Sequence, residues 1–415
     1  MSHIADLQDF VVASPTSYHA AATIAERLRA AGFTQLDERA PWESATGKRF
    51  IVRHGAVIAW VAPETLEADA GARIVGTHTD SPGFKVKPGD LLTSAGWTQI
   101  GVEVYGGPLI NSWLDRDLGV AGRIVTRDGG QHLVATGPIC RIPQLAIHLD
   151  RQVNDGLKLD KQQHLQPILT MVPRGGLMEH LAGLAGVDKD DIAFHDLYTF
   201  DTQRPEVIGL DEEFLASARL DNLACTHAGL VAMESAEVGR DVAVLAAFDH
   251  EEVGSATTSG AAGPILEDVL RRLAAGYGLG EDATRAFLAR SSCVSADTGH
   301  VVHPNYPNHH DPVVRPLPNQ GPLVKINAQQ RYATDAVGTA IWLAACEKAG
   351  VPTQPFVSNN AVPCGSTIGP ITATRLGITT VDVGIGLLSM HSARELCGVE
   401  DPEFLARAVT AYWSP

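Results

Sequence analysis

Apolar and polar positions along the chain follow two different periods, and the change between them predicts how the protein is organised. In residues 16–31 the apolar side chains recur every three or four positions, which predicts a helix, and Gly32 suits the position just after its last turn. Residues 50–63 and 73–82 contain short apolar runs that predict strands. The first part of the chain is therefore expected to mix helices and strands.

The pattern changes between about residues 91 and 208. Strand-like runs such as WTQIGVEVYGG and LGVAGRIVTRDGG follow one another there, separated by glycine-containing turns, with little helical periodicity. After residue 215 helices and strands alternate again. We therefore predict an α/β fold in which residues 1–90 and 209–415 form one α/β domain and residues 91–208 form an inserted β-rich domain.

Length, charge and cysteine content narrow the function classes. The chain has 415 residues, too long for one ordinary core, which agrees with a domain and an insertion. Its formal net charge of −16 argues against nucleic acid or an anionic membrane as the main partner. No secretory leader is visible, and no apolar run reaches the about 18 residues of a membrane span. The six cysteines lack paired spacing, so we expect reduced thiols and a cytoplasmic protein.

Metal-ligand side chains follow several strand-like runs directly, in the segments IVGTHTD, FDHEE, VSAD and LLSMH. In open α/β sheets sites form outside the carboxyl ends of the strands, so residues far apart in the sequence can converge there. The segment RLDN adds a carboxylate near a helix start. These candidate residues are His78, Asp80, Asp221, Glu251, Glu252, Asp297 and His391.

Their chemistry suits two divalent cations. Two histidines and three carboxylates can hold a pair of ions, with one carboxylate bridging them, and such a pair acidifies a water and polarises a scissile carbonyl. One of two adjacent glutamates can then ligate while the other takes a proton. Asp80 is a candidate catalytic residue placed to fix the ring of His78. A zincin helix is excluded, because the second histidine that it needs is replaced by Gly254.

Seven blocks of the sequence resemble a known family. GTHTDSPGFKVKP, SARLDNL, DHEEVGS, SADTGHVVHPNY, GPLVKINAQQRYATD, SNNAVPCGSTIGPI and MHSARE look like the M18 metallopeptidases, the aspartyl aminopeptidases, from about residue 14 to 397. The resemblance implies a three-layer α/β metallopeptidase domain with an inserted β-rich dimerisation domain. It further implies a zinc aminopeptidase that removes N-terminal Asp or Glu from peptides and assembles into tetrahedral dodecamers.

The resemblance also assigns the metal ligands. It implies that His78 and Asp297 bind one metal ion. Glu252 and His391 would bind the second ion, and Asp221 would bridge the two. The family's metal is zinc, although carboxylate-rich sites also accept manganese or cobalt with modest discrimination.

Four further residues match functional positions of the family. Glu251 matches the general base, and His300 and Lys325 match positions that contact substrate. His148 matches a histidine that the inserted domain lends to a neighbouring subunit. The segment PQLAIHLDR around it alternates apolar and polar residues, which predicts a strand with His148 on the polar side.

Three other functions remain as alternatives. A deacylase on the same dinuclear scaffold would release an acyl group from an amino acid, and a peptide-versus-acyl-amino-acid assay separates the two. A non-catalytic shell protein would be expected to lack some metal-type residues, yet all are present. A glycosidase with Glu251 and Glu252 as its catalytic pair is disfavoured, because adjacent residues of a strand point apart.

Two further segments are expected to carry no metal ligand. Because adjacent strand residues point apart, His250 is expected to pack in the core. HPNYPNHH is interpreted as a mobile polar loop without metal ligands, because its prolines break any fixed helical spacing.

Overall fold

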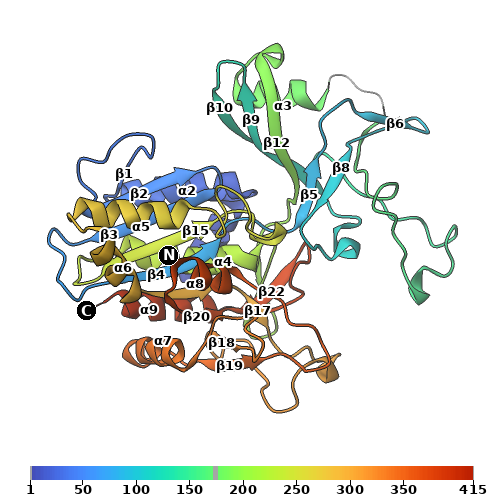
Figure 1. Ribbon diagram of the computed structural model, residues 1–415. Helices are drawn as coiled ribbons and strands as arrows, with labels where there is room; N and C mark the ends of the chain where they lie inside the picture. The colour runs from blue at the N-terminus through green and yellow to red at the C-terminus, as the bar shows by residue number, and fades with distance from the viewer. Residues whose placement is uncertain (1, 172–175, 415) are drawn as a thin grey trace.

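The computed structural model describes residues 2–171 and 176–414. The chain forms two lobes, with a large α/β lobe at the left of Figure 1 and a smaller β-rich lobe above and to its right. The chain enters the smaller lobe after residue 82 and leaves it after residue 201.

The large lobe is built on a nine-stranded mixed sheet. Its middle strands β15, β4, β16 and β20 are parallel, and antiparallel pairs flank them on both sides. In spatial order the strands are β1 (Thr34–Gln35), β2 (Gly47–Arg53), β3 (Ala56–Ala62), β15 (Val242–Phe248), β4 (Ala72–His78), β16 (Ser292–Ala296), β20 (Thr379–Gly384), β18 (Leu323–Ile326) and β19 (Gln354–Val357).

Helices cover both faces of this sheet, which confirms the predicted three-layer α/β fold. The middle strands are almost fully buried because both of their faces are covered, and β15 is apolar and buried at every position. One face carries α1 (His3–Ala13), α2 (Ser17–Ala30), α4 (Leu220–Glu234), α7 (Ala336–Ala349) and α9 (Asp401–Trp413). The other carries α5 (Ile265–Gly276), α6 (Glu281–Ala289) and α8 (Ile368–Leu376).

The smaller lobe has its own sheets and core. Its five-stranded sheet runs β10 (Gln131–Ala135), β9 (Leu118–Thr126), β12 (Ile192–Asp201), β5 (Gly83–Val86) and β8 (Val102–Tyr105). A three-stranded sheet contains β11 (Ile168–Thr170), β7 (Trp97–Gln99) and β6 (Leu92–Ser94). The sequence pattern missed one helix here, α3 (Leu177–Ala185), which buries Leu177 and Leu181 against this core.

A fourth sheet connects the lobes. It contains β13 (Glu206–Ile208), β14 (Phe214–Ser217), β22 (Glu395–Gly398), β21 (Gly386–Leu388) and β17 (Gly299–His300). Five short 3-10 turns complete the described elements: η1 (Ile110–Trp113), η2 (Val153–Asp155), η3 (Lys189–Asp191), η4 (Glu251–Val253) and η5 (Pro307–His309).

Several local predictions can be compared with these elements. The helix expected at residues 16–31 is α2, and Gly32 follows its last turn with a φ of +85°, a conformation that glycine adopts without strain. None of the six cysteines forms a disulfide, and Cys364 alone among them is not fully buried.

Within the described residues, no helix combines the length and apolarity needed to cross a bilayer. The division of the chain at residues 91 and 208 stays a prediction, and strand β5 of the smaller lobe precedes the first of these boundaries.

Candidate metal centre

Three neighbouring parallel strands bring three ligand-type segments to one edge of the nine-stranded sheet. His78 is the last residue of β4, and it pairs in register with Phe248 at the end of β15. On the other side, Ser295 of β16 faces Gly76, so Asp297 comes level with His78. Because the strands run parallel, their carboxyl ends meet, as the sequence pattern predicts.

The remaining two ligand-type residues come from outside this sheet. Asp221 lies at the start of α4, where its backbone is not yet helical and a cis peptide bond follows it. His391 follows β21, which belongs to the connecting sheet. The expectation that His391 stands at the end of a strand of the central α/β sheet is therefore wrong, because LLSMH contributes to a separate antiparallel sheet packed beside it.

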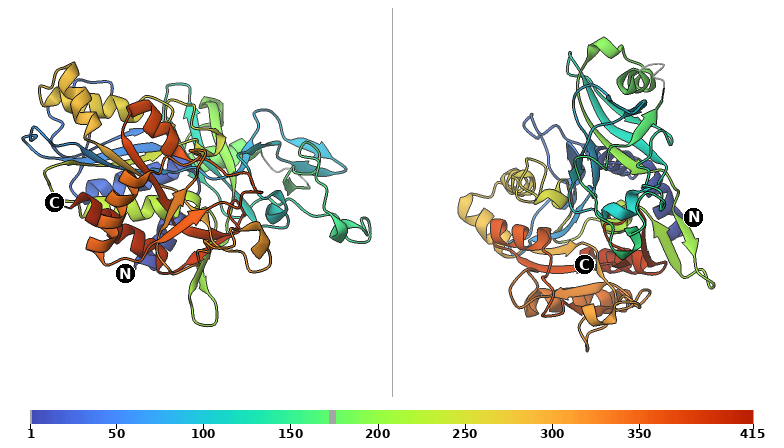
Figure 2. Two further views of the ribbon diagram at one scale, coloured as in Figure 1. Left: turned by 60° about the horizontal axis from the view of Figure 1, so that its bottom comes forward. Right: turned by 90° about the vertical axis from the view of Figure 1, so that its right-hand side faces the viewer.

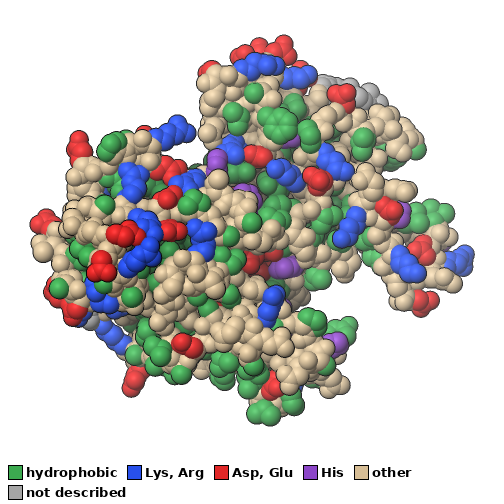
Figure 3. Space-filling view, viewed as in Figure 1, with side chains coloured by type: hydrophobic (Ala, Val, Ile, Leu, Met, Phe, Trp, Pro, Cys, Tyr) green, Lys and Arg blue, Asp and Glu red, His purple; other side chains and the backbone are tan. Residues whose placement is uncertain are grey.

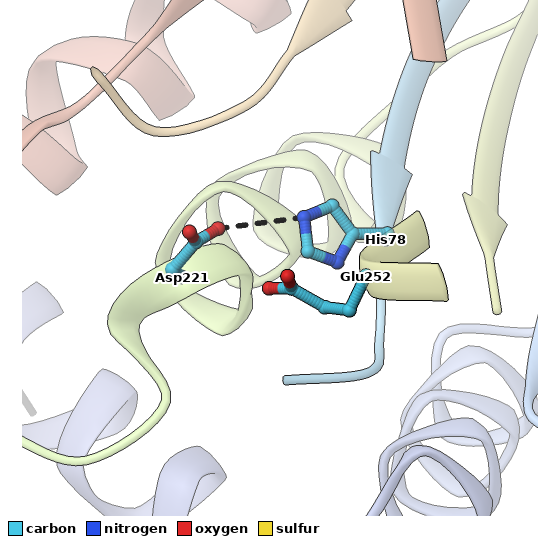
Figure 4. Close-up of side chains that lie close together, drawn as sticks. All are labelled: His78, Asp221 and Glu252. Carbon is cyan, nitrogen blue, oxygen red and sulfur yellow. Dashed lines mark ion pairs between the residues drawn. The ribbon is translucent and has the colours of Figure 1, made fainter. Parts of the chain in front are cut away.

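The carboxylate of Asp221 lies between the two histidines. Its Oδ1 is 3.4 Å from Nε2 of His78, and its Oδ2 is 3.3 Å from Nε2 of His391. Figure 4 shows Asp221, His78 and Glu252 converging on one point, and one ligand atom from each lies within 4.8 Å of the others. Asp221 thus presents one oxygen to each of two groups of side chains.

Each histidine has a second carboxylate partner. Nε2 of His78 lies 3.3 Å from Oδ1 of Asp297, and Nε2 of His391 lies 3.6 Å from Oε2 of Glu252. The other oxygen of Asp297 lies 3.5 Å from the ammonium group of Lys325. The ligand-type residues therefore fall into a His78–Asp297 group and a His391–Glu252 group, with Asp221 shared.

Burial and charge in this cluster fit a bound cation. Burial opposes ionisation of Asp221, but the two histidines outweigh it and hold the pKa of this carboxyl well below its ordinary value. Burial and the neighbouring Asp221 raise the pKa of Glu252 well above its ordinary value. Asp221 Oδ1 and Glu252 Oε1 are buried without a hydrogen-bond partner among the described residues. Unpartnered buried carboxylate oxygens are costly, and a divalent cation would satisfy them.

Glu251 stands apart from the ligand groups. Among the described residues its carboxylate makes no hydrogen bond or ion pair, and it lines the open cleft. Burial is the main cause that raises its pKa to about 7, followed by the fields of His78, which lowers it, and of Asp297, which raises it. A carboxyl group with a pKa near neutrality can both accept and return a proton, which suits general acid–base catalysis.

The backbone around Glu251 and Glu252 is not extended. His250 has a φ of +63°, and the two glutamates begin the 3-10 turn η4. The argument that adjacent strand residues point apart is therefore wrong for this pair, although the two histidines still disfavour a glycosidase. His250 itself is half-buried and bonded to Thr257, so the prediction that it packs in the core is also wrong.

Asp80 does more than orient His78. The ring Nδ1 of His78 lies 3.0 Å from the backbone carbonyl of Asp80, while the nearest carboxylate oxygen is 3.4 Å away. The carboxylate instead accepts the backbone N–H groups of Glu251, at 3.0 Å, and Glu252, at 3.2 Å. Asp80 therefore anchors the turn that carries both glutamates.

Sequence reasoning missed Glu395, the last residue of the quoted block MHSARE. This buried carboxylate accepts the backbone N–H of Asp221 at 2.9 Å and that of His391 at 2.7 Å. Burial is the main cause that raises its pKa to about 8. Its position four residues after His391 offered a signal, but its partner at Asp221 is 174 residues away in the sequence.

A cleft of about 670 Å³ opens over the cluster, a volume typical of ligand sites. His300 and Lys325, both predicted to contact substrate, line it together with Arg331. Apart from the four carboxylates of the cluster, the described residues that line the cleft include no Asp or Glu. Figure 3 shows acidic and histidine side chains together in the hollow between the lobes.

A family model described as aminopeptidase I zinc metalloprotease (M18) matches residues 10–413. The chain belongs to the M18 aminopeptidase family. The probable M18 family aminopeptidase 2 of Streptomyces coelicolor is 52% identical over 423 residues, covering 100% of this chain and 98% of that protein. A Pseudomonas aeruginosa protein with the same description is 44% identical over 422 residues, covering 98% and 97%.

Solved structures agree with this M18 assignment. The cryo-EM structure of the Ape4 and Nbr1 complex contains a chain that is 34% identical, with a TM-score of 0.94, covering 99% of this chain and 85% of that one. The S. cerevisiae mApe1 dodecamer is 30% identical, with a TM-score of 0.85, covering 99% and 95%. The predicted family is confirmed. The M18 family is one of zinc metalloproteases, so this chain is a metalloaminopeptidase.

One predicted feature of this M18 aminopeptidase, the strand around His148, differs in the structure. His148 lies in an exposed turn of residues 147–149 and not in a strand, within a segment of the smaller lobe that projects away from its strands (Figures 1 and 2). Residues 144–150 alternate between apolar and polar side chains, but they pair with no strand of a described sheet and therefore do not form a strand. The interpretation of HPNYPNHH as a mobile polar loop stays a prediction; in the structure Asn359 donates to the carbonyl groups of Asn308 and His310 of this segment.

Proposed function

We propose that the protein is a dinuclear metalloaminopeptidase that hydrolyses N-terminal Asp or Glu from peptides. The observation that carries the proposal is the position of Asp221, with one carboxylate oxygen facing His78 and the other facing His391. His78 and Asp297 would hold one ion, and His391 and Glu252 would hold the other. Zinc is the metal that the family description names, and manganese or cobalt would suit the same donors.

The bound ions would polarise the scissile carbonyl and lower the pKa of the attacking water. Glu251 takes the proton from that water and returns it to the leaving amine. Its unpartnered carboxylate, open to the cleft, supports this role. Asp80 keeps Glu251 in place through the backbone N–H group that it accepts.

Two cationic side chains of the cleft, Lys325 and Arg331, support a preference for acidic residues. Lys325 is buried at the base of the cleft, with its ammonium group beside Asp297. Lys325 is therefore close to the His78–Asp297 group, where the N-terminal residue of a peptide would lie. His300 and Arg331 line the same cleft, and apart from the four carboxylates assigned to the metal centre and the base its described lining includes no Asp or Glu.

Replacing Lys325 with alanine is expected to reduce kcat/KM on Asp-peptides at least about tenfold more than on Ala-peptides. A charge-assisted hydrogen bond contributes about 1.5–3 kcal/mol, and about 1.4 kcal/mol corresponds to a tenfold change. The ratio of the two substrates is the informative quantity, because Lys325 also touches Asp297 and its loss affects both. The measurement is kcat/KM over a panel of N-terminal residues.

The matched variant is Arg331→Ala, which removes an exposed cation of the same cleft. A selective loss on Asp-peptides in Arg331→Ala with none in Lys325→Ala would transfer the specificity role to Arg331. Equal losses on Asp- and Ala-peptides in both variants would contradict an acidic specificity site. Activity of the wild type on acyl-amino acids in place of peptides would favour the deacylase.

We also propose that the protein acts as a homo-oligomer, a tetrahedral dodecamer, in which His148 reaches a neighbouring site. Around His148, the side chains of Leu145, Ile147 and Leu149 are 61%, 46% and 73% exposed. An apolar cluster of this kind on a projecting segment is expected to be buried by a partner. The related mApe1 structure is described as a dodecamer. Residues 91–208 would then act as the oligomerisation domain of a cytoplasmic enzyme.

A further inference from the structure

We propose that Tyr105, Gly106 and Gly107 of the smaller lobe are positioning residues of the metal centre in the same chain. Tyr105 ends strand β8, and the two glycines follow it. In this order the three residues contact Asp80, Glu252 and His391. The inference rests on the proposed dinuclear function and goes beyond it, because it gives the inserted lobe a role in each subunit's own site.

Tyr105 connects the smaller lobe to the anchor of the glutamate turn. Its hydroxyl donates to Oδ2 of Asp80 at 2.8 Å, the same oxygen that accepts the backbone N–H of Glu252. The two carboxylate oxygens of Asp80 therefore hold Glu251, Glu252 and the smaller lobe at once. A side chain fixed from both lobes can turn little, so η4 keeps its place over the cleft.

Gly106 leaves the space that Glu252 fills. A Cβ on this glycine would lie 3.0 Å from Cβ of Glu252 and 3.3 Å from its carbonyl oxygen. Neither atom is the free end of a flexible side chain, so Glu252 would have to move by a few tenths of an ångström. The φ of Gly106 is +67°, which further disfavours any other residue.

Gly107 fixes the ring of His391. Its carbonyl oxygen accepts the Nδ1–H of His391 at 2.9 Å, which leaves Nε2 facing Asp221 and Glu252. Hydrogen bonding of one ring nitrogen sets the tautomer and the orientation of the other. The backbone N–H of Leu109 also donates to the carbonyl of His391, at 2.9 Å.

The contacts of the two glycines fall on the His391–Glu252 group. Gly106 lies against Glu252 and Gly107 accepts from His391, whereas residues 105–107 make no hydrogen bond or ion pair with His78 or Asp297 among the described residues. A disturbance of the segment should therefore weaken one metal position much more than the other. A general loss of folding would weaken both.

The first test is a titration of Zn²⁺ into the chelator-treated, fully assembled protein, comparing wild type with Gly106→Ala. The expected result is two ions per subunit in the wild type, and in the variant one ion bound as before and the other about 10–100-fold more weakly. The control is Gly186→Ala, because Gly186 has the same φ of +67° in the same lobe but open space around its Cβ position. It should bind zinc as the wild type does.

The second test does not depend on backbone strain. Tyr105→Phe removes only the hydroxyl that holds Asp80, and it is expected to lower kcat about 10–100-fold with KM little changed. The control is Tyr198→Phe, since the Tyr198 ring packs edge-on against Tyr105 without a hydrogen bond to the site among the described residues. It should keep wild-type kcat.

The outcomes separate the inference from the proposed function. Two tight ions in Gly106→Ala together with wild-type kcat in Tyr105→Phe would overturn the inference while leaving the dinuclear centre intact. Fewer than two ions in the wild type would contradict the proposed function instead. In that case the kcat of Tyr105→Phe against Tyr198→Phe still decides whether the smaller lobe positions Asp80.

Discussion

Replacing Glu251 with glutamine is expected to lower kcat by roughly 10²–10⁴-fold while both metal ions stay bound. Glutamine has the same size but cannot accept the proton of the attacking water. Glu251 is not part of the group of ligand atoms formed by His78, Asp221 and Glu252, so its replacement is expected to remove no metal ligand. The measurement combines steady-state kinetics with metal analysis of the purified variant.

The matched variant is Glu252→Gln, one residue further along the same turn. Glu252 lies 3.6 Å from His391 and carries a buried, unpartnered oxygen, so its replacement should lower the metal content. Metal loss in Glu251→Gln with full metal content in Glu252→Gln would reverse the two assignments. Wild-type activity in Glu251→Gln would remove it from the mechanism.

Replacing His148 with alanine is expected to lower kcat by roughly 10²–10³-fold if it donates to the oxyanion of a neighbouring subunit's substrate. The exposed turn that carries His148 does not line the cleft of its own chain. Dissociated subunits should therefore be inactive even with both ions bound. Activity measured across a dilution series, beside the oligomeric state, tests this dependence.

Hybrid oligomers give the sharper test of His148. Co-expressed His148→Ala and Glu251→Gln chains each lack a different half of the site. Mixed assemblies should regain activity through sites that combine Glu251 of one chain with His148 of the other. Mixed oligomers no more active than the two single variants would place His148 outside any shared site.

The sequence predicted the part of the site that follows local patterns. His78, Glu251 and Asp297 come directly after or near the ends of buried apolar strands, and parallel pairing brings those ends together. The three-layer fold was accessible for the same reason, since helix and strand periods differ along the chain. The specific role of Asp221 required the family resemblance, because a carboxylate at a helix start is common.

Other features carried no local signal. Glu395 acts through backbone N–H groups at Asp221 and His391, and Tyr105 acts on Asp80 across two lobes. Such contacts produce no periodic pattern of apolar and polar residues in the sequence, because each depends on how distant segments pack. The turn at Glu251 was misjudged because one residue, His250, adopts a positive φ and ends the strand.

Anomalous scattering from crystals of the zinc-loaded protein tests the dinuclear centre most directly. The expected result is two peaks per subunit, one beside His78 and Asp297 and one beside Glu252 and His391, with the carboxylate of Asp221 touching both. A single peak, or two peaks of which one lies away from Asp221, would contradict the proposed centre.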